Sequence, residues 1–492
     1  MFDITKMNEY REGNRLEVKA AQKGLPGSLW ETYSSFANTN GGIVLLGVEE
    51  NDDKSLRTSG VSDPDKLIKI FWDTINNRNK ASVNILRDSN VYTGKAGDKD
   101  IIVIEVPRAL RQDRPVYIDG NPYGGTYRRN GEGDYKCTKS EVNNMIRDSC
   151  DVTQDRTVLE KRSLDVLDKE TVTRYRMRFS NFKLNHVWTP LPDEVFLQKI
   201  GAINRGDDGI LHPTIAGLLL FGQDTEIVKE FPNYFLDYRE ILGKEGERWS
   251  DRVTSGTGDW SGNLYDFYYR IQDRLTSDVK VPFVLRNGQD RIDETRMHEA
   301  RREALANALI HSDYNERRGI VVEKKKTEIV ISNPGALRIS KEEALNGGVS
   351  DPRNSVLFTM FSLVGIGERA GSGLMKIEVA WKEENLPAPI LSEQFNPDRT
   401  ILVLPLTQND GVKDGVNVGT NVGVNVGTKL TKTERKIFEL LGNNGRVTAS
   451  DLAAEIVVDV RTIERGLKKL KDKNFIEHVG PTKSGEWKIL KN

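Results

Sequence analysis

Residues 36–50 read FANTNGGIVLLGVEE, and this stretch decides how the first part of the chain folds. It joins two patterns. The segment 25–40, LPGSLWETYSSFANTN, has the spacing of a helix, whereas the apolar run that follows is typical of a buried strand. Gly41 and Gly42 stand between the two, where the chain must reverse. The stretch therefore predicts a helix followed directly by a buried strand, as in an α/β or α+β domain.

Strand and helix signals alternate on both sides of this stretch. Upstream, LEVKA at 16–20 is strand-like. Downstream, residues 61–79 contain a helix pattern, DIIVIEVPR at 100–108 reads as a strand, and PVYIDGNPYGGTYRRNG at 115–131 is hairpin-like. These signals predict a first α/β or α+β domain at residues 1–150.

The rest of the chain divides by composition. Residues 151–290 hold helical patterns and are expected to form a connecting domain, and residues 291–408 read as another α/β unit. Residues 409–428 repeat Gly, Asn and Val without a helix pattern, which predicts a flexible linker, although alternating Val also suits an edge strand. Residues 429–492 form the last predicted domain. The expected fold class is a multidomain α+β or α/β protein.

The composition excludes several classes of protein. The 492 residues include 72 basic and 73 acidic side chains, so any surface that attracts nucleic acid must be local. Cys137 and Cys150 alone are too few for a disulfide framework. The start of the chain lacks the charged and apolar regions of a signal peptide, and the longest apolar run, at 215–222, is too short to span a bilayer. A cytoplasmic location is expected.

The last domain has three helix patterns followed by two strand patterns around a Pro/Lys/Ser/Gly turn, which is the order of a winged helix-turn-helix. Its third helix is expected to read DNA, because short polar and basic residues reach base edges and basic residues hold phosphates. A winged helix used for dimerisation or protein contact is the alternative. The candidate nucleic-acid-binding residues are Arg461, Thr462, Arg465, Lys468, Lys469 and Lys483.

Three motifs in residues 291–377 point to a nucleotide. In EALANALIHSDY the spacing of four places Glu303, Asn307 and His311 on one helix face, where a carboxylate and a carboxamide can orient water and hold Mg²⁺. SNPG follows a strand, and AGSGL opens a helix whose N-terminus can bind phosphate. Each motif alone is weak, since polar helix faces and Gly-Ser-Gly turns are common. The other candidate residues are Asp313, Asn333, Gly335, Gly371, Ser372 and Gly373.

In this order the three motifs resemble the GHKL ATP-binding fold, in the variant found in bacterial Schlafen-like regulators. The resemblance covers about 120 residues and includes RNSVLFTMFSLVGIGERAGSGL. It implies that Asn307 binds Mg²⁺, that Glu303 activates water, and that Gly371 and Gly373 contact the phosphates of ATP. The family's first glycine box carries an aspartate that reads adenine, and SNPGAL has none. A helicase can be set aside, because the chain has no Walker A motif.

Residues 12–50 resemble the Schlafen, or divergent AlbA-like, domain through Glu12, Glu17, Lys19 and SSFANTNGGIVLLGVEE. In Schlafen ribonucleases two glutamates at this spacing and a later acidic residue hold a divalent metal. The resemblance thus implies Mg²⁺ or Mn²⁺ on Glu12, Glu17 and a third carboxylate from Glu49 or Glu50. Lys19 shares the strand face of Glu17 and is a further catalytic candidate. A solvated strand with a plain ion pair is the alternative.

Two hypotheses follow from these motifs and resemblances. In the first, the protein is an ATP-binding, metal-dependent endonuclease that acts on RNA such as tRNA and serves in defence. In the second, it is a transcriptional regulator whose winged helix binds DNA in response to ATP, with a non-catalytic Schlafen-like domain. A plain ATPase is a third possibility. The resemblance also implies a homo-oligomer.

Overall fold

The computed structural model divides the chain into two compact units, Met1–Thr420 and Asn421–Asn492. The predicted linker at 409–428 lies outside the residues that the structure describes. The described residues are 4, 10–243, 248–281, 285–286, 290–291, 294–367, 373–395 and 397–407, and in the C-terminal region 437, 441, 448, 451–453, 460–472, 476–479 and 486–489.

The first part of the chain is built on a four-stranded sheet with the order β1-β2-β6-β5. The predicted helix, reversal and buried strand are confirmed, since α1 ends at Asn38 and β2 begins at Gly42. Gly41 has a φ of +67°, and a Cβ there would lie 2.7 Å from the carbonyl oxygen of Val106, so the tight reversal requires glycine. The elements are β1 (Leu16–Lys19), α1 (Leu29–Asn38), β2 (Gly42–Leu46), β3 (Val48–Glu50), β4 (Leu56–Thr58), α2 (Pro64–Ile75), β5 (Val91–Ala96) and β6 (Lys99–Val106).

Both faces of this sheet are covered. Alternate residues of β2 and β6 pack against α1 and α2 on one face. The residues between them share the other face with Leu16 and Val18 of β1 and pack against β3 and β4.

A hairpin and the helix α4 complete this part of the chain. Thr138 caps α4 together with Glu141, which explains where this helix begins. These later elements are α3 (Pro122–Gly125), β7 (Tyr127–Asn130), β8 (Gly133–Lys136) and α4 (Lys139–Ser149).

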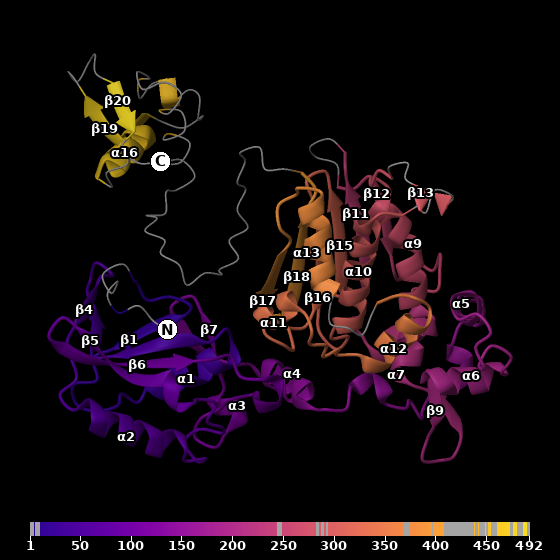
Figure 1. Ribbon diagram of the computed structural model, residues 1–492, viewed down its shortest axis with the longest axis horizontal. Coiled ribbons are helices and arrows are strands. Elements are labelled where there is room, and N and C mark those ends of the chain that lie inside the picture. The colour runs from indigo at the N-terminus through magenta and orange to yellow at the C-terminus, as the bar shows by residue number, and fades with distance from the viewer. Residues whose placement is uncertain are drawn as a thin grey trace. The chain divides into compact units, whose positions relative to one another are not determined.

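A six-stranded sheet with the order β12-β11-β15-β16-β18-β17 dominates the remainder of the first unit. Only β11 and β15 are parallel neighbours within it. Figure 1 shows α9, α10 and α13 side by side over one face of this sheet, and α10 contacts both other helices. The elements are β11 (Leu236–Ile241), β12 (Asp251–Thr254), α9 (Leu264–Thr276), β13 (Leu285–Arg286), β14 (Asp290–Arg291), α10 (Arg296–His311), β15 (Ile320–Lys325), β16 (Glu328–Pro334), α11 (Lys341–Asn346), α12 (Ser355–Leu363), α13 (Gly373–Glu383), β17 (Ile390–Gln394) and β18 (Arg399–Pro405).

The sheet and its core extend across the predicted boundary at 290. β11 and β12 belong to the predicted connecting segment, and one hydrophobic core runs from Leu167 to Leu404. The apolar run at 211–222 becomes a short strand and a buried helix inside that core. The connecting elements are α5 (Lys169–Phe182), α6 (Asp193–Ile200), β9 (Ile203–Arg205), β10 (Leu211–Pro213), α7 (Ile215–Phe221) and α8 (Asp224–Glu230).

The second unit contains α16 (Val460–Asp472) and the antiparallel pair β19 (Ile476–Val479) and β20 (Glu486–Ile489), as predicted for a helix followed by a wing. The mixed, multidomain α and β class predicted from the sequence is confirmed. Among the described residues, no helix has the length and apolar character needed to cross a membrane.

Candidate functional site

Three predicted residues reach one cleft from α10. Glu303, Asn307 and His311 recur every four residues, so they follow one face of the helix, and all three line the same cleft. The opposite face is apolar and buries Leu305 and Leu309 in the core. Eight residues of helix span about 12 Å at 1.5 Å per residue. The cleft is therefore long enough for an extended ligand.

The sheet forms the facing wall of this cleft. Ile331 and Asn333 alternate along β16, and their partners across the ladder are Leu402 and Thr400 of β18. All four side chains line the cleft, because residues two apart on a strand share a face. The wall is thus apolar at one level and polar at the next. Asn333 is buried, and its Nδ2 donates to the carbonyl oxygen of Pro334 at 3.3 Å.

The N-terminus of α13 approaches the two polar residues of α10. A Cβ at Gly373 would lie 2.5 Å from Oε1 of Glu303 and 2.9 Å from Nδ2 of Asn307. The backbone at this position therefore comes closer to both side chains than any other residue would allow. Two further predicted residues, Gly371 and Ser372, lie outside the described residues.

Two predicted residues lie away from this group. Asp313 follows the end of α10, and its carboxylate pairs with Arg147 of α4 at 2.8 Å. Gly335 has a φ of +98°, and its amide donates to the carbonyl oxygen of Asp398 at 2.8 Å. A Cβ at Gly335 would lie 2.5 Å from Nη1 of Arg353. Both positions are thus engaged in contacts that shape the end of the cleft.

Arg353 and Asn354 hold the C-terminus of α10 in place. Nη1 of Arg353 donates to the carbonyl oxygen of His311 at 2.5 Å, and Nδ2 of Asn354 donates to those of Ile310 and Ser312 at 2.9 and 2.8 Å. The last carbonyl groups of a helix have no partner within it, so these bonds complete the helix end. Burial and the nearby guanidinium of Arg353 lower the pKa of His311 to about 4.

The inner end of the cleft carries charged residues that the motifs did not single out. Arg338, Asp351 and Arg353 all line it. Arg353 is the first residue of the RNSVLF stretch, so the sequence offered a signal for this one residue. Arg338 and Asp351 stand in no recognisable pattern, because Arg338 pairs with Asp351, and Asp351 in turn pairs with Arg111, 240 positions away.

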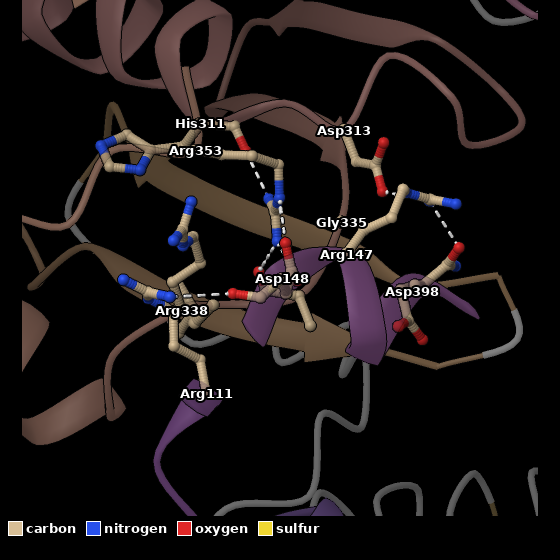
Figure 2. A network of polar contacts seen from close by, with 12 residues as sticks. Arg111, Arg147, Asp148, His311, Asp313, Gly335, Arg338, Arg353 and Asp398 are labelled. Carbon is tan, nitrogen blue, oxygen red and sulfur yellow. Dashed lines mark hydrogen bonds and ion pairs between the residues drawn. The ribbon is translucent and has the colours of Figure 1, made fainter. Parts of the chain in front are cut away.

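These residues join the cleft to the first part of the chain. Figure 2 shows Arg147 and Asp148 of α4 directed toward Asp313 and Arg353. Asp148 accepts from Nε and Nη2 of Arg353 at 2.9 and 2.7 Å. Although burial opposes it, Arg353 holds the pKa of Asp148 below its ordinary value. Asp351 accepts from Nε of Arg111 at 2.5 Å.

The second candidate group lies around β1. Glu17 and Lys19 share a face of the strand, as predicted, and are joined by a hydrogen bond of 2.8 Å. Glu17 also accepts from Nη2 of Arg129 at 2.7 Å. Glu12 accepts from the amide of Val18 at 2.9 Å. The carboxylates that were expected to hold metal are therefore already bound by protein donors.

Glu49 and Glu50 take different places. Glu49 pairs with Arg57 across the β3–β4 ladder. Glu50 lies close enough to Glu12 to affect its titration. Burial, and to a smaller extent the charges of Glu17 and Glu50, raise the pKa of Glu12. Oε1 of Glu50 is buried and accepts no hydrogen bond from any residue within the described ranges. Glu50, rather than Glu49, thus belongs to the electrostatic group of Glu12.

This group does not form an assembled metal site. Within the part of the chain that the structure describes, no set of three or more His, Cys, Asp or Glu side chains is arranged to hold a metal ion. Arg129, which the motifs did not single out, explains part of this. Its side chain is almost fully buried, and it pairs with both Glu17 and Asp134, so it supplies positive charge beside the acidic group.

In the second unit, α16 is amphipathic. Ile463, Leu467 and Leu470 are buried, whereas four of the predicted nucleic-acid-binding residues are exposed and Thr462 is half-buried. Spacing of four places Arg461 and Arg465 on the same exposed face. Lys483 lies outside the described residues. The exposed residues are Arg461, Arg465, Lys468 and Lys469.

Four stretches of the chain match known protein families. Residues 9–138 match the family described as "Schlafen, AlbA_2", and residues 143–237 match a domain of unknown function. Residues 317–402 match "Putative ATP-dependent DNA helicase recG C-terminal", and residues 430–477 match "Winged helix-turn-helix DNA-binding". The predicted order of a Schlafen-like domain, an ATPase-like domain and a winged helix is confirmed. These matches support a nucleic-acid-binding protein.

Comparison with other proteins adds little beyond these domains. None of the curated proteins matches the chain. The DIP2311 protein from Corynebacterium diphtheriae is 16% identical over 97% of this chain and 94% of its own, with a TM-score of 0.39. The N-terminal domain of a RecG-related protein from Nitrosomonas europaea is 27% identical over 28% of this chain and 95% of its own, with a TM-score of 0.22.

Proposed function

We propose that this protein binds ATP with a divalent cation in the cleft between α10 and strands β16 and β18, and that it acts on nucleic acid. The observation that supports this most is the approach of Gly373 to Glu303 and Asn307. This approach gathers the start of a helix, a carboxylate and a carboxamide at one place, and these are groups that bind phosphate and its cation. The apolar level of the sheet wall, with Ile331 and Leu402, suits a flat base.

The described residues offer suitable groups for the cation and for water. The carboxamide oxygen of Asn307 is a hard ligand of the kind that Mg²⁺ prefers. The carboxylate of Glu303, one helical turn away, can accept a proton from water. When bound, the cation would neutralise charge on the phosphate oxygens. Asn333 stands where the related fold places an aspartate, and its carboxamide can both accept and donate toward a base.

Titration of the full chain with Mg·ATP tests the proposed site. Asn307→Ala is expected to weaken binding about tenfold or more, which corresponds to about 1.4 kcal/mol. Asn181→Ala is the matched control, since Asn181 is an exposed helical asparagine in α5. Binding by the wild type that Asn307→Ala leaves unchanged would place the nucleotide elsewhere. Absence of binding by the wild type would remove the proposal.

The nucleic-acid partner is proposed from the winged helix and the Schlafen-like domain. Four basic residues exposed on α16 favour DNA, as a regulator that responds to ATP would require. Exposed basic side chains suit both operator binding and sequence-independent contact with DNA. The choice depends on whether Arg461 and Arg465 reach base edges or only phosphates.

A metal-dependent ribonuclease is the second candidate, and one observation favours it. Glu50 has a buried oxygen without a hydrogen-bond donor among the described residues, and its charge acts on Glu12. A divalent cation would relieve both conditions. The test incubates tRNA with the full chain and Mg²⁺ or Mn²⁺, with and without ATP. Glu50→Gln should abolish cleavage, while the neighbouring Glu49→Gln should retain it. Intact tRNA under every condition would exclude this activity.

A further inference from the structure

Arg338 is a buried arginine with too few acceptors. It is only 8% exposed and lines the inner end of the cleft. Its Nη1 donates to the carbonyl oxygen of Pro352 at 3.3 Å, but Nε and Nη2 donate to no acceptor that the structure describes. Burying unsatisfied N–H groups of a charged side chain is costly. An acceptor is therefore missing from the surroundings of Arg338.

Arg353, an equally buried arginine of the same cleft, has the hydrogen-bond acceptors that Arg338 lacks. It is 9% exposed, and it donates to Asp148 and to the carbonyl oxygens of His311 and Ala336. Nη2 of Arg338 lies 3.3 Å from Oδ1 of Asp351 as an ion pair without a hydrogen bond, and Oδ2 of the same carboxylate accepts from Arg111. Arg338 thus has one ion pair but only one hydrogen bond among the described residues.

The buried charges at this end are mostly positive. Three guanidinium groups, those of Arg111, Arg338 and Arg353, face the carboxylates of Asp148 and Asp351, and the third carboxylate, Asp151 beside Arg111, is exposed to solvent. Burial and the charge of Arg353 lower the pKa of Arg338, as expected for a cation without sufficient compensation. An electron-rich ligand in the cleft would supply what the protein lacks.

We propose that the cleft is a composite site, in which Arg338 donates hydrogen bonds to acceptor atoms of the bound nucleotide. Arg111 and Asp148 come from the first part of the chain and act as positioning residues. Arg111 holds the Oδ2 atom of Asp351, and Asp148 holds Arg353 against the end of α10. The inference rests on the proposed nucleotide site. Neither positioning residue is among the described residues that line the cleft.

A composite site links two events. If docking of the first part of the chain raises the affinity of the cleft for the nucleotide by some factor, a bound nucleotide must strengthen that docking by the same factor. The acceptor atoms belong either to the phosphates or to the base, because the guanidinium can donate to both. Adenosine and inorganic triphosphate, tested separately, distinguish these two sources.

The test compares two interdomain arginines in the full chain. Arg128 forms a bidentate pair with Asp398 at 2.5 and 2.8 Å and is as deeply buried as Arg111, but neither Arg128 nor Asp398 is among the described lining residues. Calorimetric titration with Mg·ATP, and separately with Mg·GTP, gives the affinity of each variant. Thermal unfolding reports the stability of the same samples, and Asp148→Asn replaces Arg111→Ala if that variant does not fold.

Arg338→Ala is expected to weaken binding about tenfold or more. Arg111→Ala should weaken it about fivefold, the lower end of ordinary coupling between sites. Arg128→Ala should lower the unfolding temperature but leave the affinity within about twofold. Unchanged affinity in Arg338→Ala and Arg111→Ala, or an equal loss in Arg128→Ala, would overturn the composite site while the nucleotide site stands. A wild type that binds neither nucleotide would overturn both.

Discussion

At the scale of single residues, helical spacing was enough to find one wall of the cleft. Glu303, Asn307 and His311 share a helix face whatever the tertiary structure, so the sequence alone could predict their grouping. Arg338 and Asp351 could not be predicted in this way. Their surroundings depend on Arg111 and on the packing of α4, which no local pattern reports.

Gly373→Ala tests the close approach at the N-terminus of α13. The new Cβ would lie 2.5 Å from the carboxylate of Glu303 and 2.9 Å from the carboxamide of Asn307, so the proposed cation ligand must move and nucleotide affinity should fall about tenfold. Gly27→Ala is a suitable control, because a Cβ there meets no atom within 4 Å. Equal affinities for the two variants in a Mg·ATP titration would contradict the assigned phosphate position.

His311 should make stability depend on pH. Its pKa is about 4 in the folded protein and about 6.5 when unfolded, so between these values the unfolded chain binds the extra proton. Stability from neutral His311 is therefore present above pH 6.5 and is lost as the pH falls toward 4. Between pH 7.5 and 5.5 the loss is about 1.4 kcal/mol. Urea unfolding of the first unit should show that His311→Gln loses less stability over this range by that amount. Equal losses of stability in the wild type and in His311→Gln would contradict the lowered pKa of His311.

At the scale of elements, α16 was the part of the second unit that the sequence predicted most clearly. Buried Ile463, Leu467 and Leu470 follow helical spacing, which left the basic residues on the outer face. The fold of the middle of the chain could be predicted less well. Its β11 and β12 join a sheet whose other strands lie after residue 290, and strand pairing over such distances has no signature in a single sequence.

Two substitutions on α16 separate base reading from phosphate contact. If Arg461 reaches a base, Arg461→Ala should cost about 1–3 kcal/mol on the preferred DNA and relax specificity at one position. Lys468→Ala should weaken binding to all sequences alike and reduce the salt dependence by about one charge. The measurement is DNA binding by the full chain at several salt concentrations. A uniform loss from Arg461→Ala would argue against operator recognition.

At the scale of the whole molecule, the order of domains was accessible from sequence because each domain carries its own motif. The contacts between α4 and the cleft were not, since they rely on buried ion pairs such as Arg353 with Asp148. These pairs lie within the compact unit that contains the Schlafen-like domain and the cleft, and the winged helix belongs to the other unit.

This division predicts how a nucleotide affects unfolding. A ligand that binds only the folded first unit adds about 2.7 kcal/mol to its stability at a concentration of 100 times Kd. Differential scanning calorimetry of the full chain should therefore show an upward shift in the transition of residues 1–420 with Mg·ATP. The transition of residues 421–492 should not move. A shift confined to the second transition would contradict the assignment.

The central claim is that ATP lies between α10 and the sheet, and a crystal structure with a non-hydrolysable ATP analogue and Mg²⁺ tests it most directly. We predict the phosphates beside Gly373 and Asn307, the base against Ile331 and Leu402, and an acceptor atom of the nucleotide within hydrogen-bond distance of Arg338. A nucleotide bound outside this cleft, or phosphates at the opposite end beside His311, would contradict the account.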